Sequence, residues 1–132
     1  ITAVPEIVAA GFPGENLYFT DGNLSNYSDE FEAGLINGAK GTISVTANIA
    51  PAKMAAMCNA AVAGNAEDAA TIDKSLEGLH KNLFLEANPI PAKWALAEMG
   101  RIPKGIRLPL TELSPEHHDA LRDAMRMAGV TN

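Results

Sequence analysis

The chain has 132 residues, of which 47% are hydrophobic, and its formal net charge is -6. This length and apolar content are enough for a hydrophobic core, and the composition lacks the polar bias of a disordered segment. The ten Lys and Arg residues are spread singly along the chain, so we expect no basic surface and no nucleic-acid partner.

The single cysteine and the lack of long apolar runs are typical of a cytoplasmic protein. Cys58 is the only cysteine, which excludes an intramolecular disulfide, and its Ala- and Met-rich helical pattern favours a buried, unreactive thiol. No apolar run approaches the roughly 18 residues that span a bilayer, and no charged leader precedes one. We therefore expect a cytoplasmic protein with no membrane partner.

The N-terminal third predicts one strand, helix, strand unit. A short helix is expected over residues 5–10, and "NLYFT" at 16–20 reads as a buried parallel strand that stops at Asp21-Gly22. A polar loop and a helix from about Ser28 follow, and a second strand is predicted over 42–45. This spacing is typical of a right-handed crossover between parallel strands.

The sequence after the polar triplet at 46–48 is predicted to be mainly helical. Four helices are expected, over 50–63, from 65 to about 86, in "NPIPAKWALAEMG", and in "SPEHHDALRDAMRMAG" with Ser114 as its cap. The second of them should bury one apolar stripe, formed by Ala69, Ile72, Leu76, Leu79 and Leu83. Two parallel strands do not make a stable sheet, so the remaining strands must come from elsewhere.

At "GAKGTISVTANIAPAKM" and "HKNLFLEANPIPAKWALAEMGRIPKGIRLPLTELS" the sequence resembles the dihydrodipicolinate synthase family of pyruvate-dependent lyases. The resemblance covers roughly residues 38–130; before residue 38 it is looser, because the loop after "ENLYFTDGN" is longer and more polar than the family's. It implies an α/β fold, the C-terminal part of a (β/α)8 TIM barrel: the last two βα units in 1–63 and a helical C-terminal extension in 64–132. A whole barrel takes about 250 residues, so an N-terminal barrel portion is missing.

The resemblance also implies the chemistry. Enzymes of this family condense pyruvate with aspartate semialdehyde in lysine biosynthesis, through a Schiff base on a lysine at the end of the sixth strand. They use no cofactor, and we expect a homo-oligomer, a homotetramer by resemblance. No residue here matches that lysine, the proton-relay residues, the semialdehyde-binding arginine or the lysine-inhibition site. The chain alone is therefore predicted to contain no catalytic residue and to be inactive.

Two positions are carried over as substrate-binding residues. Gly22 matches a glycine that leaves room beside bound pyruvate, and Ile43 matches an isoleucine that packs against it. Both lie toward the carboxyl ends of the predicted strands, where barrel enzymes carry their sites.

Other candidates have simpler interpretations. Adjacent His117 and His118 point about 100° apart on a helix with no i, i+4 partner, so we predict solvent-facing histidines and no metal site. His80 reads as an edge residue of the apolar stripe. Three lysines in turns or first helical turns read as solvated and not as Schiff-base lysines: Lys40, Lys53 and Lys93.

Two alternative functions stay open. One is another pyruvate-dependent aldolase of the same fold, such as a sialic acid or sugar-acid aldolase, against which "NPIPAKWAL" argues. The other is a non-catalytic module that keeps the helical extension for assembly.

Overall fold

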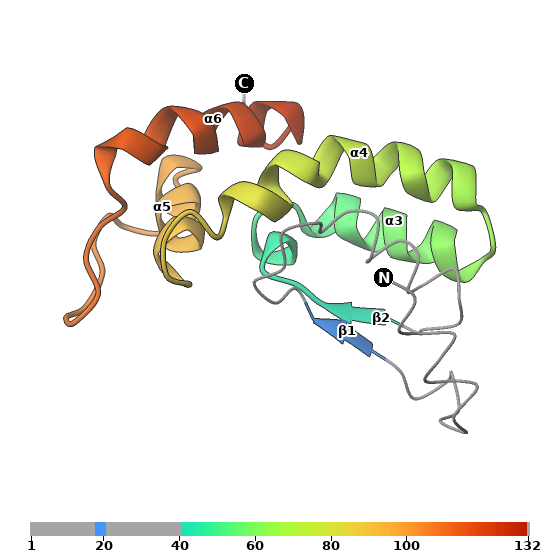
Figure 1. Cartoon of the computed structure of the whole chain (residues 1–132), viewed down its shortest axis with the longest axis horizontal. Helices are drawn as coiled ribbons and strands as arrows, with labels where there is room; N and C mark the ends of the chain where they lie inside the picture. Colours follow the sequence, from blue (N-terminus) through green and yellow to red (C-terminus); the bar gives the residue numbers. More distant parts are fainter. Residues whose placement is uncertain (1–17, 21–40, 132) are drawn as a thin grey trace.

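The computed structural model describes residues 18–20 and 41–131, arranged as Figure 1 shows. Two short strands, β1 (Tyr18–Thr20) and β2 (Gly41–Ile43), pair in parallel, as predicted. The helices that follow are η2 (Thr46–Asn48), α3 (Pro51–Val62), α4 (Ala66–Asn82), α5 (Ile90–Glu98), η3 (Pro115–His117) and α6 (His118–Met127). The helices expected over 5–10 and from about Ser28, together with Gly22 and Lys40, lie outside the described residues.

The second strand is shorter than predicted. It ends at Ile43, because Val45 already has helical backbone angles, φ -64° and ψ -39°, and leads into η2. The apolar run "ISV" therefore contains the change from strand to helical turn.

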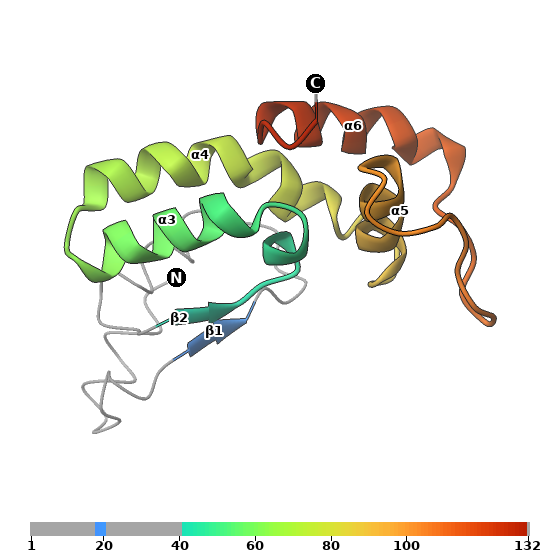
Figure 2. The same cartoon turned by 180° about the vertical axis from the view of Figure 1, so that it is seen from behind.

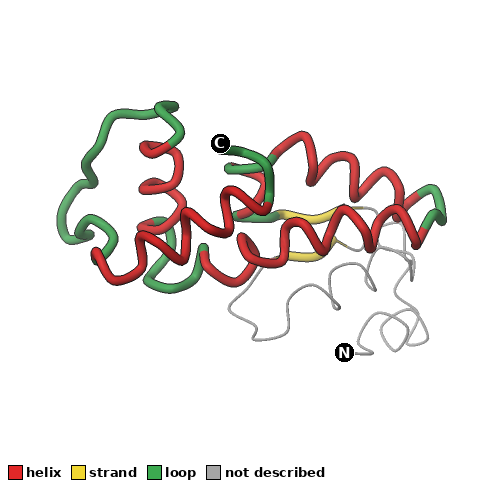
Figure 3. Tube along the Cα trace, turned by 90° about the horizontal axis from the view of Figure 1, so that it is seen from above, coloured by secondary structure: helices red, strands yellow, loops and turns green. Residues whose placement is uncertain are grey.

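The described elements form layers. Helix α3 lies over one face of the β1–β2 pair, α4 packs along α3, and α6 packs on α4 (Figures 1 and 2). Seen from above, α5 runs across the direction of α3 and α4 (Figure 3). Helix α4 is thus the central element, with α3 on one side and α6 on the other.

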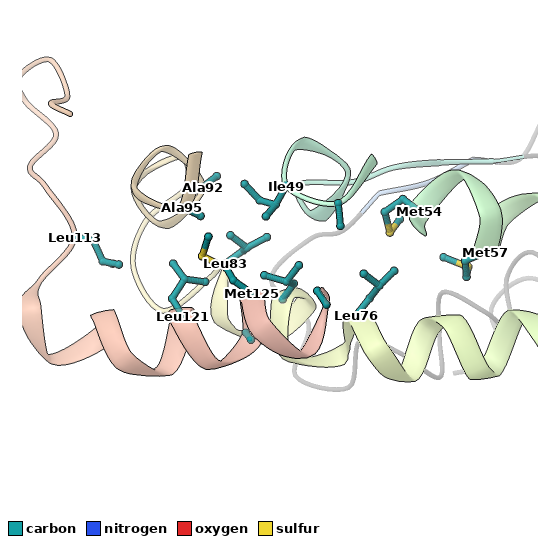
Figure 4. Close-up of a cluster of buried hydrophobic side chains, with 14 of the residues drawn as sticks. Ile49, Met54, Met57, Leu76, Leu83, Ala92, Ala95, Leu113, Leu121 and Met125 are labelled. Atoms are coloured by element: carbon teal, nitrogen blue, oxygen red, sulfur yellow. The ribbon is translucent and has the colours of Figure 1, made fainter. Parts of the chain in front are cut away.

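One continuous core joins these helices (Figure 4). The predicted stripe of α4 is confirmed: Ala69, Leu76, Leu79 and Leu83 are buried and Ile72 is half-buried. Gly78 lets α6 approach α4 closely, since a Cβ there would lie 3.1 Å from Ala124 Cβ. The other helices contribute Met54, Met57, Ala92, Ala95, Leu121 and Met125.

The two ends of α4 differ in how well they were predicted. Asn65 is its N-cap as expected, because its side chain accepts a hydrogen bond from the Asp68 N–H at 3.3 Å. The helix ends at Asn82 and not at about Glu86, because the N–H groups that follow its C-cap Leu83, those of Phe84 and Leu85, bond only three residues back. The chain turns there so that the start of α5 reaches the core.

The last helix also begins differently from the prediction. Ser114 makes no side-chain cap; its backbone N–H instead donates to Glu86 Oε1 at 3.0 Å, and η3 precedes α6. His117 Nε2 lies 3.9 Å from the same carboxylate oxygen. Glu86 therefore ties the segment after α4 to the start of the last helical stretch.

The environment of Glu86 predicts that this residue stabilises the fold against unfolding in a pH-dependent way. Hydrogen bonding by Ser114, helped by His117, lowers the pKa of Glu86 below its ordinary value. A lowered carboxyl pKa stabilises the fold above the unfolded value of about 4.3 and loses that effect as the pH falls through the folded value. Glu86→Gln should therefore be less stable than the parent at pH 7, and the difference should narrow below about pH 4.3.

Urea unfolding followed by far-UV circular dichroism, repeated from pH 7 to about pH 3, measures this difference. Glu77→Gln, at an exposed position of α4, is the matched control and should follow the parent at every pH. A Glu86→Gln difference that is constant with pH would show that the carboxylate charge is not the stabilising feature.

Candidate functional site

The candidate site begins at the carboxyl end of β2. Ile43 is the last residue of this strand, lies opposite Thr20 of β1, and is 67% exposed. Its neighbours Thr42 and Ser44 are half-buried, as expected when alternate side chains point to opposite faces. Because α3 covers one face of the pair, we assign the exposed Ile43 side chain to the face opposite α3, which a closed barrel would turn inward.

The turn after β2 is held by its own backbone. The Val45 carbonyl accepts hydrogen bonds from the N–H of Asn48 at 3.0 Å and from its side chain at 3.1 Å. The Thr46 carbonyl accepts from the N–H groups of Ile49 and Ala50, both at 2.9 Å. Since Ala50 is the N-cap of α3, this turn sets where the strand stops and where α3 begins.

Three buried polar side chains lie behind this turn, and we call Thr46, His80 and Asp73 the buried polar cluster. Thr46 Oγ1 is 2.9 Å from His80 Nδ1, and His80 Nε2 is 3.2 Å from Asp73 Oδ1. The exposed fractions are 0%, 1% and 2%. Asp73 and His80 are seven residues apart on α4, two turns along one face, while Thr46 comes from 34 residues before His80.

Hydrogen-bonding chemistry pairs the groups of the cluster. A carboxylate only accepts hydrogen bonds, so an N–H on His80 Nε2 is the donor that suits Asp73. With the proton on Nε2, Nδ1 of a neutral imidazole accepts from the Thr46 hydroxyl. Outside the cluster, burial and then the nearby Asp73 raise the pKa of the Cys58 thiol.

Three of the sequence interpretations are corrected here. His80 is fully buried within a polar cluster and is not an edge residue, because Thr46 and Asp73 supply partners for both ring nitrogens. His118 is half-buried and stacks on Trp94 with ring centroids 4.6 Å apart, and His117 is also half-buried, so neither is simply solvent-facing. Cys58 is half-buried and not fully buried.

The sequence contained a signal for the buried polar cluster. Asp73 and His80 fall on the face of the helix that carries Leu76, Leu79 and Leu83, where a polar residue requires a partner. Periodicity identifies that face but not the partner, so Thr46 was missed.

Two of the three lysines expected to be solvated, Lys53 and Lys93, lie among the described residues and are partly exposed. Lys53 Nζ donates to Ser75 Oγ at 3.1 Å, joining α3 to α4, and Lys93 is half-buried on α5. Within residues 18–20 and 41–131, no group of three His, Cys, Asp or Glu side chains could hold a metal ion. No helix in the same part of the chain is long and apolar enough to cross a membrane.

A second polar region lies where α5 meets α6. Arg122 pairs with Glu98 at 2.9 Å and lies 5.1 Å from the centre of the Trp94 ring; the hydrogen bond to Glu98 raises the pKa of Arg122. A cavity of about 230 Å³ adjoins these residues. Because Arg122 and Glu98 pair with each other, we interpret this region as a contact that holds α5 against α6 and not as a binding site.

Sequence comparison relates the chain to one family. The dihydrodipicolinate synthetase family matches residues 14–128. A 4-hydroxy-tetrahydrodipicolinate synthase from Thioalkalivibrio sulfidiphilus is 58% identical over 97 residues, which are 74% of this chain and 33% of that relative. The same enzyme from Pseudomonas aeruginosa is 59% identical over 96 residues, 73% of this chain and 33% of that relative.

Solved structures lead to the same family. The chloride-inhibited dihydrodipicolinate synthase from Acinetobacter baumannii, complexed with pyruvate, aligns with a TM-score of 0.77 and 44% identity, covering 86% of this chain and 37% of that chain. The 4-hydroxy-tetrahydrodipicolinate synthase from Methylacidiphilum fumariolicum aligns with a TM-score of 0.81 and 29% identity, covering 96% and 40%. The chain thus spans about a third of the length of the curated relatives it matches.

Proposed function

The chain belongs to the dihydrodipicolinate synthetase family, and on this premise we propose that it works as the C-terminal portion of a 4-hydroxy-tetrahydrodipicolinate synthase. The observation that best supports this proposal is the 58% identity to such a synthase over 97 residues. The complete enzyme would condense pyruvate with aspartate semialdehyde in lysine biosynthesis. Residues 1–63 would supply the last two βα units of the barrel, and residues 64–132 the helical extension.

In this proposal, the lysine that forms the imine with pyruvate belongs to the missing N-terminal portion. There a lysine amine would attack the ketone of pyruvate and lose water to give the imine, which makes the pyruvate methyl group a carbon nucleophile. This chain contributes pocket wall: Ile43 from the end of β2 and Gly22 from the segment after β1. Ile43 supports this role because it combines a strand-end position with a side chain that is 67% exposed.

The partners of the complete enzyme follow from the same proposal. We place it in the cytoplasm as a homo-oligomer, with a homotetramer as the expected assembly. One structural neighbour, 37% identical, is described as a monomeric variant, so assembly is a separate question from the fold. Leu108, 87% exposed on the connector between α5 and η3, is available for contact with another part of the enzyme.

A chimeric enzyme tests the function directly. Residues 41–132 should replace the corresponding C-terminal segment of the Pseudomonas aeruginosa relative, with the natural relative as the positive control. We expect turnover of pyruvate and aspartate semialdehyde, and one reduced-pyruvate adduct after borohydride treatment, on a lysine of the N-terminal portion. The chain alone, treated in the same way, should form no adduct.

Each other outcome contradicts part of the proposal. A folded chimera that forms the imine but does not consume aspartate semialdehyde would favour another aldolase. A folded chimera without imine would favour a non-catalytic assembly module. An adduct on Lys40, Lys53 or Lys93 of the chain alone, together with turnover, would mean that a different lysine is catalytic.

Ile43 predicts a specific effect on pyruvate binding. Ile43→Ala in the chimera removes three carbon atoms from the proposed pocket wall but keeps the strand. Losing about 1 kcal/mol of apolar contact corresponds to a rise of roughly fivefold in the pyruvate KM, with little change in melting temperature. Val62→Ala, at a half-exposed position of α3, is the matched control and should leave this KM unchanged. An unchanged pyruvate KM in Ile43→Ala would remove Ile43 from the pocket.

A further inference from the structure

The buried polar cluster connects the helical extension to the end of a barrel strand. His80 and Asp73 belong to α4, whereas Thr46 opens the turn that follows β2. All three side chains are almost completely buried, so none can touch a substrate. Any effect on the site must therefore pass through the position of the backbone that they hold.

Hydrogen bonds hold Thr46 through both its backbone and its side chain. Its carbonyl accepts from the N–H groups of Ile49 and Ala50, and its hydroxyl is bonded to His80 Nδ1 at 2.9 Å. Thr46 lies three residues after Ile43, so the turn that it opens determines where β2 stops. A turn fixed only by its local backbone bonds could still shift as a unit, whereas the His80 contact ties it to the core of α4.

We propose that His80 and Asp73 are positioning residues for the pyruvate pocket, acting through Thr46 on the end of β2. This inference rests on the proposed function. Asp73 orients the imidazole by accepting from Nε2, His80 holds the Thr46 hydroxyl, and Thr46 fixes the turn that presents Ile43 to the barrel interior. The helical extension thereby determines the shape of a pocket wall that it does not line.

A purely stabilising role makes a different prediction. Buried, hydrogen-bonded polar groups stabilise a fold whether or not they affect a site, and breaking one such bond leaves an unsatisfied partner. If stability were the only role, variants would melt earlier while the enzyme that remains folded kept the parent KM. The proposal requires a change in pyruvate KM in the folded enzyme.

The test uses the active chimera. Thr46→Val keeps the side-chain shape but removes the hydroxyl that bonds His80, and Thr46→Ser keeps the hydroxyl. Pyruvate and aspartate semialdehyde KM values, kcat per imine-forming subunit, and melting temperatures are measured for each. We expect Thr46→Val to raise the pyruvate KM at least threefold, with the aspartate semialdehyde KM within twofold of the parent, and Thr46→Ser to restore the parent pyruvate KM.

Ser75→Ala is the matched control. It removes the hydrogen bond between Lys53 on α3 and Ser75 on α4. This bond involves the helix that carries Asp73 and His80, but it does not touch the turn after β2. Its pyruvate KM should equal that of the parent even if its melting temperature falls. Should Thr46→Val fail to fold, Asp73→Asn preserves the side-chain volume, weakens the bond to His80 by removing the charge, and should raise the pyruvate KM at least twofold.

The outcomes separate the two proposals. A parent chimera with no turnover overturns the proposed function and this inference with it. An active parent whose Thr46→Val variant, or Asp73→Asn if the first does not fold, keeps the parent pyruvate KM overturns the inference alone. An equal KM rise in Ser75→Ala also overturns it, since any loosening of α3 against α4 would then suffice.

Discussion

The described part of this chain depends on a pair of parallel strands, β1 and β2, with α3 packed on one face. Among the described residues these two strands are the whole sheet, and Ile43 at the end of β2 is 67% exposed. Parallel sheets are normally buried on both faces because their connections place helices there. The strand pair is therefore the part of the molecule that needs a complement, and the family membership identifies that complement as the rest of a barrel.

The helical part is more self-sufficient. Helix α4 buries one stripe against α3 and α6, and Gly78 allows a close approach to Ala124. The core extends from Ile49, at the end of η2, to Leu113 and Met125 near the C-terminal end (Figure 4). The turn after β2 shares this core with the helical extension, since Val45 and Ala47 pack against it. The buried polar cluster adds a directional contact between the turn and α4.

The sequence was most informative where local pattern determines structure. The stripe of α4, its Asn65 cap and the parallel strand pair follow from periodicity, capping chemistry and spacing, and all three are confirmed. Helix ends were less accurate, because the segment after Asn82 is shaped by contacts with Ser114, which lies far away in the sequence. His80 and His118 were misread for the same reason, since their partners Thr46 and Trp94 come from other elements. The candidate site was reached through resemblance at Ile43, whereas its supporting residues required the three-dimensional structure.

Amide hydrogen exchange tests the central claim most directly, because it reports whether the strands of this chain pair with a missing barrel portion. Peptides that cover Gly41–Ile43 and Ala66–Asn82 should be followed in the chain alone and after adding the separately produced N-terminal portion of the Pseudomonas aeruginosa relative. We expect the strand amides to exchange far faster than those of α4 in the chain alone, and to slow strongly when the N-terminal portion is added. Strand amides that are already as protected as α4, or that do not change on addition, would contradict the account.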